Sequence, residues 1–202
     1  TVGYGMTECA PLVTYEWWAS QRPHSCGRLC DGMQARVDSP DPANVAGVLH
    51  VKGDNVMQGY FKNPEATSAA LDKDGWLDTG DICTIDSDGY VYLRGRDKNM
   101  ILTSSGQNVY PEEIEVVLNN LPLVSESLVV DRDGRIVALA HPDYEEARKL
   151  GLDEAAAEER VKGSLAALNR LLPGYSKVSA IEIQRDEFEK TPKHSIRRFL
   201  YK

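Results

Sequence analysis

The first residues of the sequence place an aromatic ring, a hydroxyl and a carboxylate close together. Tyr4, Thr7 and Glu8 stand in the segment Gly3-Tyr4-Gly5-Met6-Thr7-Glu8. An aromatic face can cover a nucleobase, a hydroxyl can contact a phosphate oxygen, and a carboxylate can hold the hard cation Mg²⁺. The same residues also suit a loop that enters a strand, so the segment indicates nucleotide chemistry only in combination with others.

A second candidate site lies at an acidic turn, Gly75-Trp76-Leu77-Asp78-Thr79-Gly80-Asp81. Asp78 is typical of a solvated turn. Asp81 differs because it directly precedes the apolar run 82–85. A carboxylate in that place can accept two hydrogen bonds from vicinal hydroxyls, as in the recognition of ribose.

Positive charge is concentrated in the C-terminal tail. Its basic residues, with no acid between them, are Lys190, Lys193, Arg197, Arg198 and Lys202. The whole chain has a formal net charge of -8 and a pI near 5.1, whereas a nucleic-acid-binding protein usually carries a basic face. We therefore expect the tail to meet a phosphate-rich small molecule, and we expect no nucleic-acid partner.

The composition is that of a soluble protein. The mean hydropathy is -0.40, and no apolar run approaches the roughly 18 residues of a membrane span, which predicts at most peripheral membrane contact. Four cysteines in a chain without a secretory signal are too few for a disulfide framework, which predicts a reducing, cytoplasmic location. The chain opens on Thr1 without an initiator Met, and we expect it to be a fragment.

The pattern of elements changes near Gly95. Before it, turns separate short strands, and Asn63-Pro64 predicts the start of one helix; after it, longer helices and strands alternate. The predicted fold class is α+β, with residues 1–95 and 96–202 as separate parts. The predicted strands are 34–37, 48–52, 82–85, 90–93, 128–130, 136–140 and 180–184, and the predicted helices are 65–71, 112–118 and 153–172. The strands 128–130 and 136–140 are expected to form a hairpin about Asp133-Gly134.

The longest informative block begins Gly95-Arg96-Asp97-Lys98-Asn99-Met100-Ile101-Leu102 and continues to Glu115. Together with the tyrosine segment, the block Gly59-Tyr60-Phe61-Lys62-Asn63-Pro64-Glu65-Ala66-Thr67 and the acidic turn, in this order, it resembles the adenylate-forming superfamily of acyl-CoA ligases, nonribosomal adenylation domains and luciferases. The resemblance runs from Tyr4 to about Tyr201. Residues 98–102 and 108–115 are most similar to bacterial long-chain fatty acid–CoA ligases.

The resemblance implies a role for each candidate residue at the nucleotide. Tyr4 would stack near adenine, Thr7 would contact the α-phosphate in catalysis, and Glu8 would help to hold Mg²⁺. Asp81 and Arg96 would bind the ribose. Residues 1–95 would then be the C-terminal portion of the large AMP-binding domain.

The resemblance also implies that residues 96–202 form a small mobile C-terminal lid domain of α/β character. Lys98 falls at the hinge position about which this domain swings. The loop of Ser104, Ser105 and Gly106 would approach the pantetheine thiol of CoA, where small residues permit close approach of the backbone.

Two departures from the family pattern affect the expected activity. The family's Ser/Thr/Gly-rich triphosphate loop, which ends in Pro-Lys-Gly, is not in this sequence, so we expect the fragment to be inactive without the missing N-terminal part of its own chain. The family's last motif has a Gly-Lys pair where His194 and Ser195 stand here. Either the flexible ammonium of Lys193 takes over the catalytic role, or the enzyme is weak or inactive.

The expected function is the ATP-dependent activation of a long-chain fatty acid through an acyl-adenylate, followed by transfer to CoA. The small-molecule partners would be ATP with Mg²⁺, the fatty acid and CoA. Two alternatives stay open. The enzyme could load a carrier protein, or the chain could belong to a non-catalytic homologue that acts as a binding or regulatory module.

Overall fold

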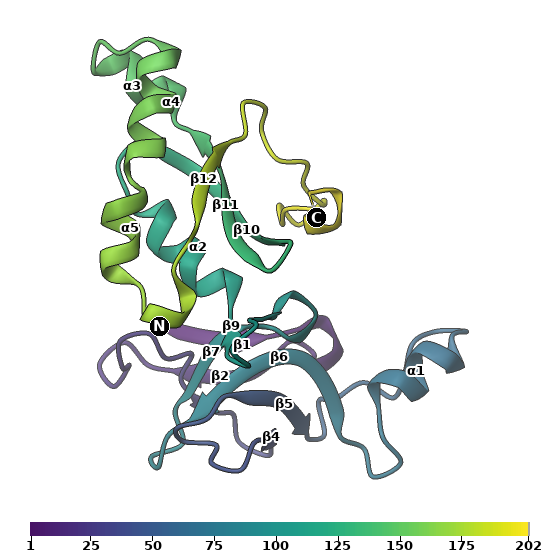
Figure 1. The fold of residues 1–202 in the computed structure, drawn as a ribbon. Helices are drawn as coiled ribbons and strands as arrows, with labels where there is room; N and C mark the ends of the chain where they lie inside the picture. Colours follow the sequence, from purple (N-terminus) through teal and green to yellow (C-terminus); the bar gives the residue numbers. More distant parts are fainter. Residues whose placement is uncertain (202) are drawn as a thin grey trace. The chain divides into compact units, whose positions relative to one another are not determined.

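The computed structural model describes residues 1–201 and divides the chain into two compact units. The first unit is Thr1–Lys98, and the second begins at Asn99. The first is rich in strands and the second contains most of the helices, so the predicted α+β class is confirmed (Figure 1). Within residues 1–201, none of the helices has the length and apolarity that a membrane span requires.

The first unit consists of two antiparallel sheets. One has the order β1-β2-β3 and the other the order β4-β5-β6-β7, so each strand pairs with its neighbour in the chain. The strands of the first sheet are β1 (Val2–Gly5), β2 (Leu12–Glu16) and β3 (Arg28–Leu29). Those of the second are β4 (Gln34–Asp38), β5 (Gly47–Lys52), β6 (Leu77–Ile85) and β7 (Val91–Arg96).

Both sheets contribute to one apolar core in the first unit. Its buried members are Cys9, Val13, Met33, Val37, Leu49, Val51, Leu77, Cys83 and Val91. The helix α1 (Pro64–Ala70) contributes no buried residue and begins as predicted, because Asn63 accepts a hydrogen bond from the Ala66 amide at 3.0 Å and Pro64 occupies the first turn.

The second unit is built on a three-stranded sheet with the order β10-β11-β12. β10 (Val124–Arg132) and β11 (Arg135–Pro142) form the predicted hairpin, in which Asp133 and Gly134 both have positive φ, as a tight two-residue turn requires. The remaining elements are α2 (Pro111–Asn119), α3 (Tyr144–Lys149), α4 (Glu154–Gly163), α5 (Leu165–Leu171), β12 (Ala180–Ile183), and the short pair β8 (Ile101–Leu102) and β9 (Asn108–Val109).

The two faces of this sheet are covered differently. Val129, Ile136, Ala138 and Ala140 pack with residues of α2, α4 and α5. The alternate residues Leu128, Val130, Val137 and Leu139 pack with Phe188, Ile196 and Tyr201 of the C-terminal segment. Because successive strand residues point to opposite faces, the segment after β12 is a third layer that covers the face away from the helices (Figure 1).

The prediction of one helix over 153–172 was wrong, because the helix is interrupted at Ser164. The Ser164 amide bonds to the Val161 carbonyl at 3.1 Å, three residues back, which ends α4, and the Ser164 hydroxyl bonds to the Arg160 carbonyl. The apolar spacing continues across this break and conceals it. The strands β1, β2 and β3 and the helix α3 were also not predicted.

Candidate functional site

Tyr4, Asp81 and Arg96 converge in the first unit. The Tyr4 hydroxyl donates to Asp81 Oδ2 at 2.5 Å, and Arg96 Nε lies 2.7 Å from Asp81 Oδ1. Asp81 and Arg96 face each other in the register of β6 and β7, while Tyr4 comes from the other sheet. Three residues that are distant in the sequence therefore form one cluster, at the point where the two sheets meet.

Asp81 supplies the buried negative charge of this cluster. It is only 6% exposed, and its amide donates to the Thr79 hydroxyl. Burial, followed by the hydrogen bond to Asp81, raises the pKa of Tyr4 well above its usual range, so the phenol remains a neutral donor. A fixed carboxylate beside an aromatic ring and a guanidinium can accept hydrogen bonds from ligand hydroxyls next to a stacked planar group.

Thr7 and Glu8 lie in the 3-10 helix η1 (Thr7–Cys9), between β1 and β2. Glu8 Oε1 accepts a hydrogen bond from the Tyr60 hydroxyl at 2.9 Å, and the Glu8 carbonyl accepts one from the Met57 amide. Thr7 is exposed. The contact brings the tyrosine segment and the block 59–67 together, and Tyr60 is a site neighbour to which the sequence assigned no role.

Gly5 explains why the chain can turn sharply before Thr7. A Cβ atom at Gly5 would lie 2.0 Å from the Pro11 carbonyl oxygen, a distance that no side chain tolerates. The Met6 amide donates to the same oxygen at 2.8 Å. A glycine is thus required for the close approach of the backbone to Pro11, at the entry to the 3-10 helix that carries Thr7 and Glu8.

Residues that could bind a metal are sparse. Over residues 1–201, no group of three or more His, Cys, Asp or Glu side chains is suited to hold a metal ion. Glu8 would therefore hold a metal ion with at most one further side chain of these types. Such a site fits Mg²⁺, which is usually held by one or two carboxylates together with phosphate and water oxygens.

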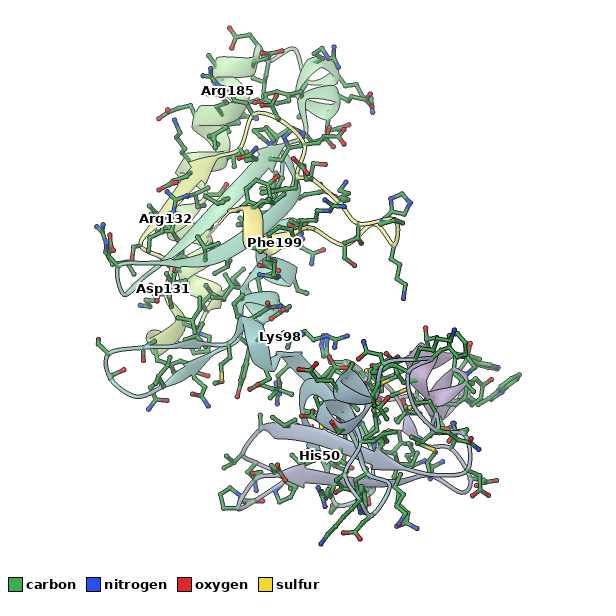
Figure 2. The ribbon with its side chains drawn as sticks, turned by 90° about the vertical axis from the view of Figure 1, so that its right-hand side faces the viewer. His50, Lys98, Asp131, Arg132, Arg185 and Phe199 are labelled. Carbon is green, nitrogen blue, oxygen red and sulfur yellow. The ribbon has the colours of Figure 1, made fainter. Side chains whose placement is uncertain are left out.

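Lys98 and the loop of Ser104, Ser105 and Gly106 lie on either side of the boundary between the units. Lys98 is exposed in the 3-10 helix η2 (Asp97–Asn99) and is the last residue of the first unit (Figure 2). The loop is an exposed turn between β8 and β9, closed by a hydrogen bond from the Thr103 amide to the Gln107 carbonyl. Gly106 has a φ of 77°, which favours glycine at this position.

Lys193 lies at the tip of a short hairpin in the second unit. Lys190 and Ile196 form an isolated antiparallel bridge, and the Thr191 amide donates to the Ser195 carbonyl at 2.9 Å. His194 has a φ of 59°, the left-handed conformation that glycine adopts most easily. The backbone here has a glycine-like turn although the residue is histidine, and both Lys193 and Ser195 are exposed.

The structure thus brings together Tyr4, Asp81 and Arg96, and separately Glu8 with Tyr60, all within the first unit. Lys193 and the loop 104–106 belong to the second unit. The sequence identified Tyr4, Asp81, Arg96 and Glu8 but not Tyr60, and it contained no signal for the contact between Tyr4 and Asp81.

Two family models match the chain. The model described as AMP-binding enzyme matches residues 1–61, and the model described as AMP-binding enzyme C-terminal domain matches residues 98–201. A long-chain-fatty-acid–CoA ligase of Yersinia pestis is 38% identical over 194 residues, covering 94% of this chain and 33% of the ligase. One from Salmonella typhi is 46% identical over 127 residues, covering 57% and 21%. The chain spans about a third or less of these two relatives.

Solved structures match nearly the whole chain. The ATP-bound MatB of Rhodopseudomonas palustris is 31% identical with a TM-score of 0.75, covering 98% of this chain and 39% of that one. The O-succinylbenzoate coenzyme A synthetase of Bacillus subtilis, in complex with ATP and magnesium ion, has a TM-score of 0.80, 24% identity, and coverage of 98% and 40%, which establishes a shared fold. With the C-terminal domain model matching 98–201, this chain belongs to the adenylate-forming family of AMP-binding enzymes.

Proposed function

We propose that the full-length protein is a long-chain fatty acid–CoA ligase and that Tyr4, Asp81 and Arg96 bind the nucleoside of ATP. The observation that carries this proposal is the cluster around the buried Asp81 carboxylate, in a chain that belongs to the adenylate-forming family. The 38% identity to the Yersinia pestis ligase supports the fatty acyl substrate.

The proposed reaction has two steps. A carboxylate oxygen of the fatty acid attacks the α-phosphorus of ATP, and the bond to the β-phosphate breaks, giving acyl-adenylate and pyrophosphate. The thiol of CoA then loses its proton and attacks the acyl carbon, and AMP leaves. Adenylation converts the carboxylate, a poor electrophile, into an activated acyl group.

Each candidate residue has a defined task in this proposal. Asp81 accepts the ribose hydroxyls, Arg96 holds Asp81 in place and faces the ribose, and Tyr4 packs against the base. Thr7 donates to the α-phosphate. Glu8 is the protein ligand of Mg²⁺, and the ion, when bound, neutralises charge on the transferring phosphate.

Lys193 is the proposed cation for the adenylation step. It projects from the exposed turn that ends at His194, and a lysine side chain can reach over several ångströms from such a tip. Ser195 occupies the family's lysine position and can supply no positive charge. Lys98 is the proposed hinge, and Ser104, Ser105 and Gly106 form the loop that approaches CoA in the second step.

We further infer that this sequence of 202 residues does not catalyse adenylation alone, because the family's triphosphate loop is not among them. Ser195 supports one competing function, a homologue that binds nucleotide without adenylating an acid. The loading of a carrier protein instead of CoA is the other alternative, and the choice of acceptor in the assay below decides it.

The test is pyrophosphate release by the full-length protein with Mg-ATP and a chain-length series of fatty acids, with and without CoA. Release that depends on a long-chain fatty acid and accelerates with CoA is expected. Release that needs a carrier protein would identify the loading enzyme. Folded protein that binds ATP but releases no pyrophosphate with any acid would contradict the ligase and favour the non-catalytic homologue.

A further inference from the structure

The hairpin that carries Lys193 is too small to hold its own position. It is closed by one bridge, between Lys190 and Ile196, and by hydrogen bonds around Thr191. An isolated two-stranded hairpin is marginal in water. The place at which Lys193 is presented therefore depends on the contacts that fix the two ends of the hairpin.

The first end is fixed by an ion pair between Lys190 and Glu126 of β10. Lys190 Nζ lies 2.7 Å from Glu126 Oε1, and the side chains are 27% and 29% exposed. Glu126 Oε2 is buried and has no hydrogen-bond partner among residues 1–201. The Lys190 ammonium is therefore the charge that compensates this carboxylate, and the hydrogen bond to Glu126 raises the pKa of Lys190.

The second end is fixed by Arg198, in the 3-10 helix η4 (Arg198–Leu200). Its guanidinium bonds to Glu115 of α2 and, at 3.4 Å, to the Val129 carbonyl. Glu115 Oε1 in turn accepts the Val129 amide at 2.7 Å. Val129 lies on β10, an edge strand of the sheet. The Glu115–Arg198 pair therefore satisfies both outward-facing backbone groups of Val129, the N–H and the C=O.

Apolar contacts complete the base of the hairpin. Ile196 packs on the cluster of Leu128, Val130, Val137 and Leu139. Phe188 and Tyr201 meet edge to face with ring centres 5.1 Å apart, and the Tyr201 hydroxyl accepts the Glu189 amide at 2.8 Å. Figure 2 shows the segment around Phe199 lying over the β10–β11 hairpin. The base is fixed while the tip, with Lys193, is exposed.

On the basis of the proposed function, we propose that the Lys190–Glu126 and Arg198–Glu115 ion pairs are a positioning device that sets the reach of Lys193 in the adenylation step. The four side chains are positioning residues, because they act through the hairpin and touch no reacting atom. Displacement of a reacting group by about 1 Å can reduce a rate by up to about 100-fold, so the loss of either pair should appear chiefly in the rate of adenylation.

The test compares Glu126→Gln with wild type in the full-length protein. Fatty-acid-dependent exchange of pyrophosphate into ATP should fall about 10-fold in kcat, with the KM for ATP unchanged. Thioester formation from supplied acyl-adenylate and CoA should stay within about 2-fold, because the proposal assigns Lys193 to adenylation alone. The charge-swapped variant E126K/K190E should recover most of the exchange that E126K and K190E each lose.

Glu182→Gln is the matched control, because the Arg132–Glu182 pair at 2.9 Å lies in the same sheet but does not touch the hairpin. If E126Q exchanges pyrophosphate at the wild-type rate while Lys193→Ala abolishes this exchange, the positioning role is overturned and the proposed function is left intact. If wild type shows no exchange with any fatty acid, the proposed function fails. In that case hydrogen–deuterium exchange of the Thr191 amide tests whether the Lys190–Glu126 pair positions the hairpin. Faster hydrogen exchange in E126Q than in wild type supports the positioning role, and an unchanged rate overturns it.

Discussion

The two units present their candidate residues in opposite ways. In the first unit, Asp81 is 6% exposed and is held by cross-strand pairing and by Tyr4 from a second sheet. In the second unit, Lys193 and the loop 104–106 project from exposed turns. The comparison indicates that Tyr4, Asp81 and Arg96, which are proposed to bind the nucleoside, are fixed by the sheets. Lys193 and the loop 104–106, which are proposed to act in the two steps, depend instead on the anchoring of short turns.

The largest expected effect concerns the layer that carries the hairpin. Phe188→Ala should destabilise the second unit by about 3–5 kcal/mol, because it removes a buried aromatic side chain from the face opposite the helices. The free energy of opening, from amide hydrogen exchange at Leu128 and Leu139, measures this loss. Phe199→Ala is the control. Because Phe199 is 70% exposed, this substitution should change the free energy of opening by less than about 0.5 kcal/mol. Equal effects would show that the segment is not a structural layer.

The next largest effect is expected on the adenylation step, for which Lys193 of the hairpin is the proposed cation. Lys193→Ala should reduce fatty-acid-dependent ATP–pyrophosphate exchange by about 10²- to 10³-fold, because a preorganised cation is lost from the developing charge. The full-length protein is assayed beside Lys177→Ala, which removes another exposed lysine of the second unit. The double variant K193A/S195K should recover part of the rate. If S195K alone accelerates exchange and K193A has no effect, Lys193 does not take over the family lysine's role.

A smaller effect is expected on nucleotide binding in the first unit. Asp81→Asn should weaken ATP binding by about 10- to 100-fold, because hydrogen bonds to a charged acceptor contribute about 1.5–3 kcal/mol. Calorimetric titration of the full-length protein measures the change, with the exposed acid Asp54→Asn as control. Equal affinities for both variants would remove Asp81 from the nucleotide site.

The smallest effects are opposite responses to pH in the two units. The hydrogen bonds from Arg28 and Ser20 lower the pKa of Glu16 to about 2, whereas burial raises the pKa of Glu115. Glu16 therefore stabilises the first unit above its unfolded pKa of about 4.3, and this stabilisation is lost as the pH falls towards 2. Glu115 behaves in the reverse sense, so its contribution is largest below about pH 4.3 and is lost as the pH rises through its folded pKa.

Hydrogen exchange between pH 3 and pH 6, corrected for the intrinsic exchange rate, tests both directions in one chain. The Trp17 amide, which bonds to Glu16, should lose protection on acidification, and the Leu128 amide, which lies in the β10–β11 ladder and reports the opening of the second unit, should gain it. Glu16→Gln and Glu115→Gln should each flatten the response in their own unit. A parallel response of both amides would contradict the assignment.

The sequence predicted the elements with a clear local signal and missed those that depend on distant packing. Asn63-Pro64 marks the start of α1, and Asp133-Gly134 marks the turn between β10 and β11. The two-residue strand β3 is too short to show any alternation, so no pattern predicted it. The break at Ser164 was hidden because apolar residues keep the helical spacing across it.

The same distinction holds for the candidate site. Asp81 and Arg96 were identified from their blocks, and the strand register places them opposite each other. The hydrogen bond from Tyr4 to Asp81 joins two sheets, and no local pattern reports how two sheets pack. The sequence also did not predict that Phe188, Ile196 and Tyr201 pack on one face of the β10–β11–β12 sheet. Their irregular spacing matches neither a helix nor a strand.

The most direct test of the contrast between the units is a comparison of Asp81→Asn and Lys193→Ala in steady-state ATP–pyrophosphate exchange by the full-length protein. Asp81→Asn should raise the KM for ATP and leave kcat within a few-fold, while Lys193→Ala should lower kcat and leave the KM for ATP nearly unchanged. If both substitutions change the same parameter, or if Asp81→Asn leaves the KM for ATP unaltered, the assignment of binding to the first unit and of adenylation chemistry to the hairpin of the second is wrong.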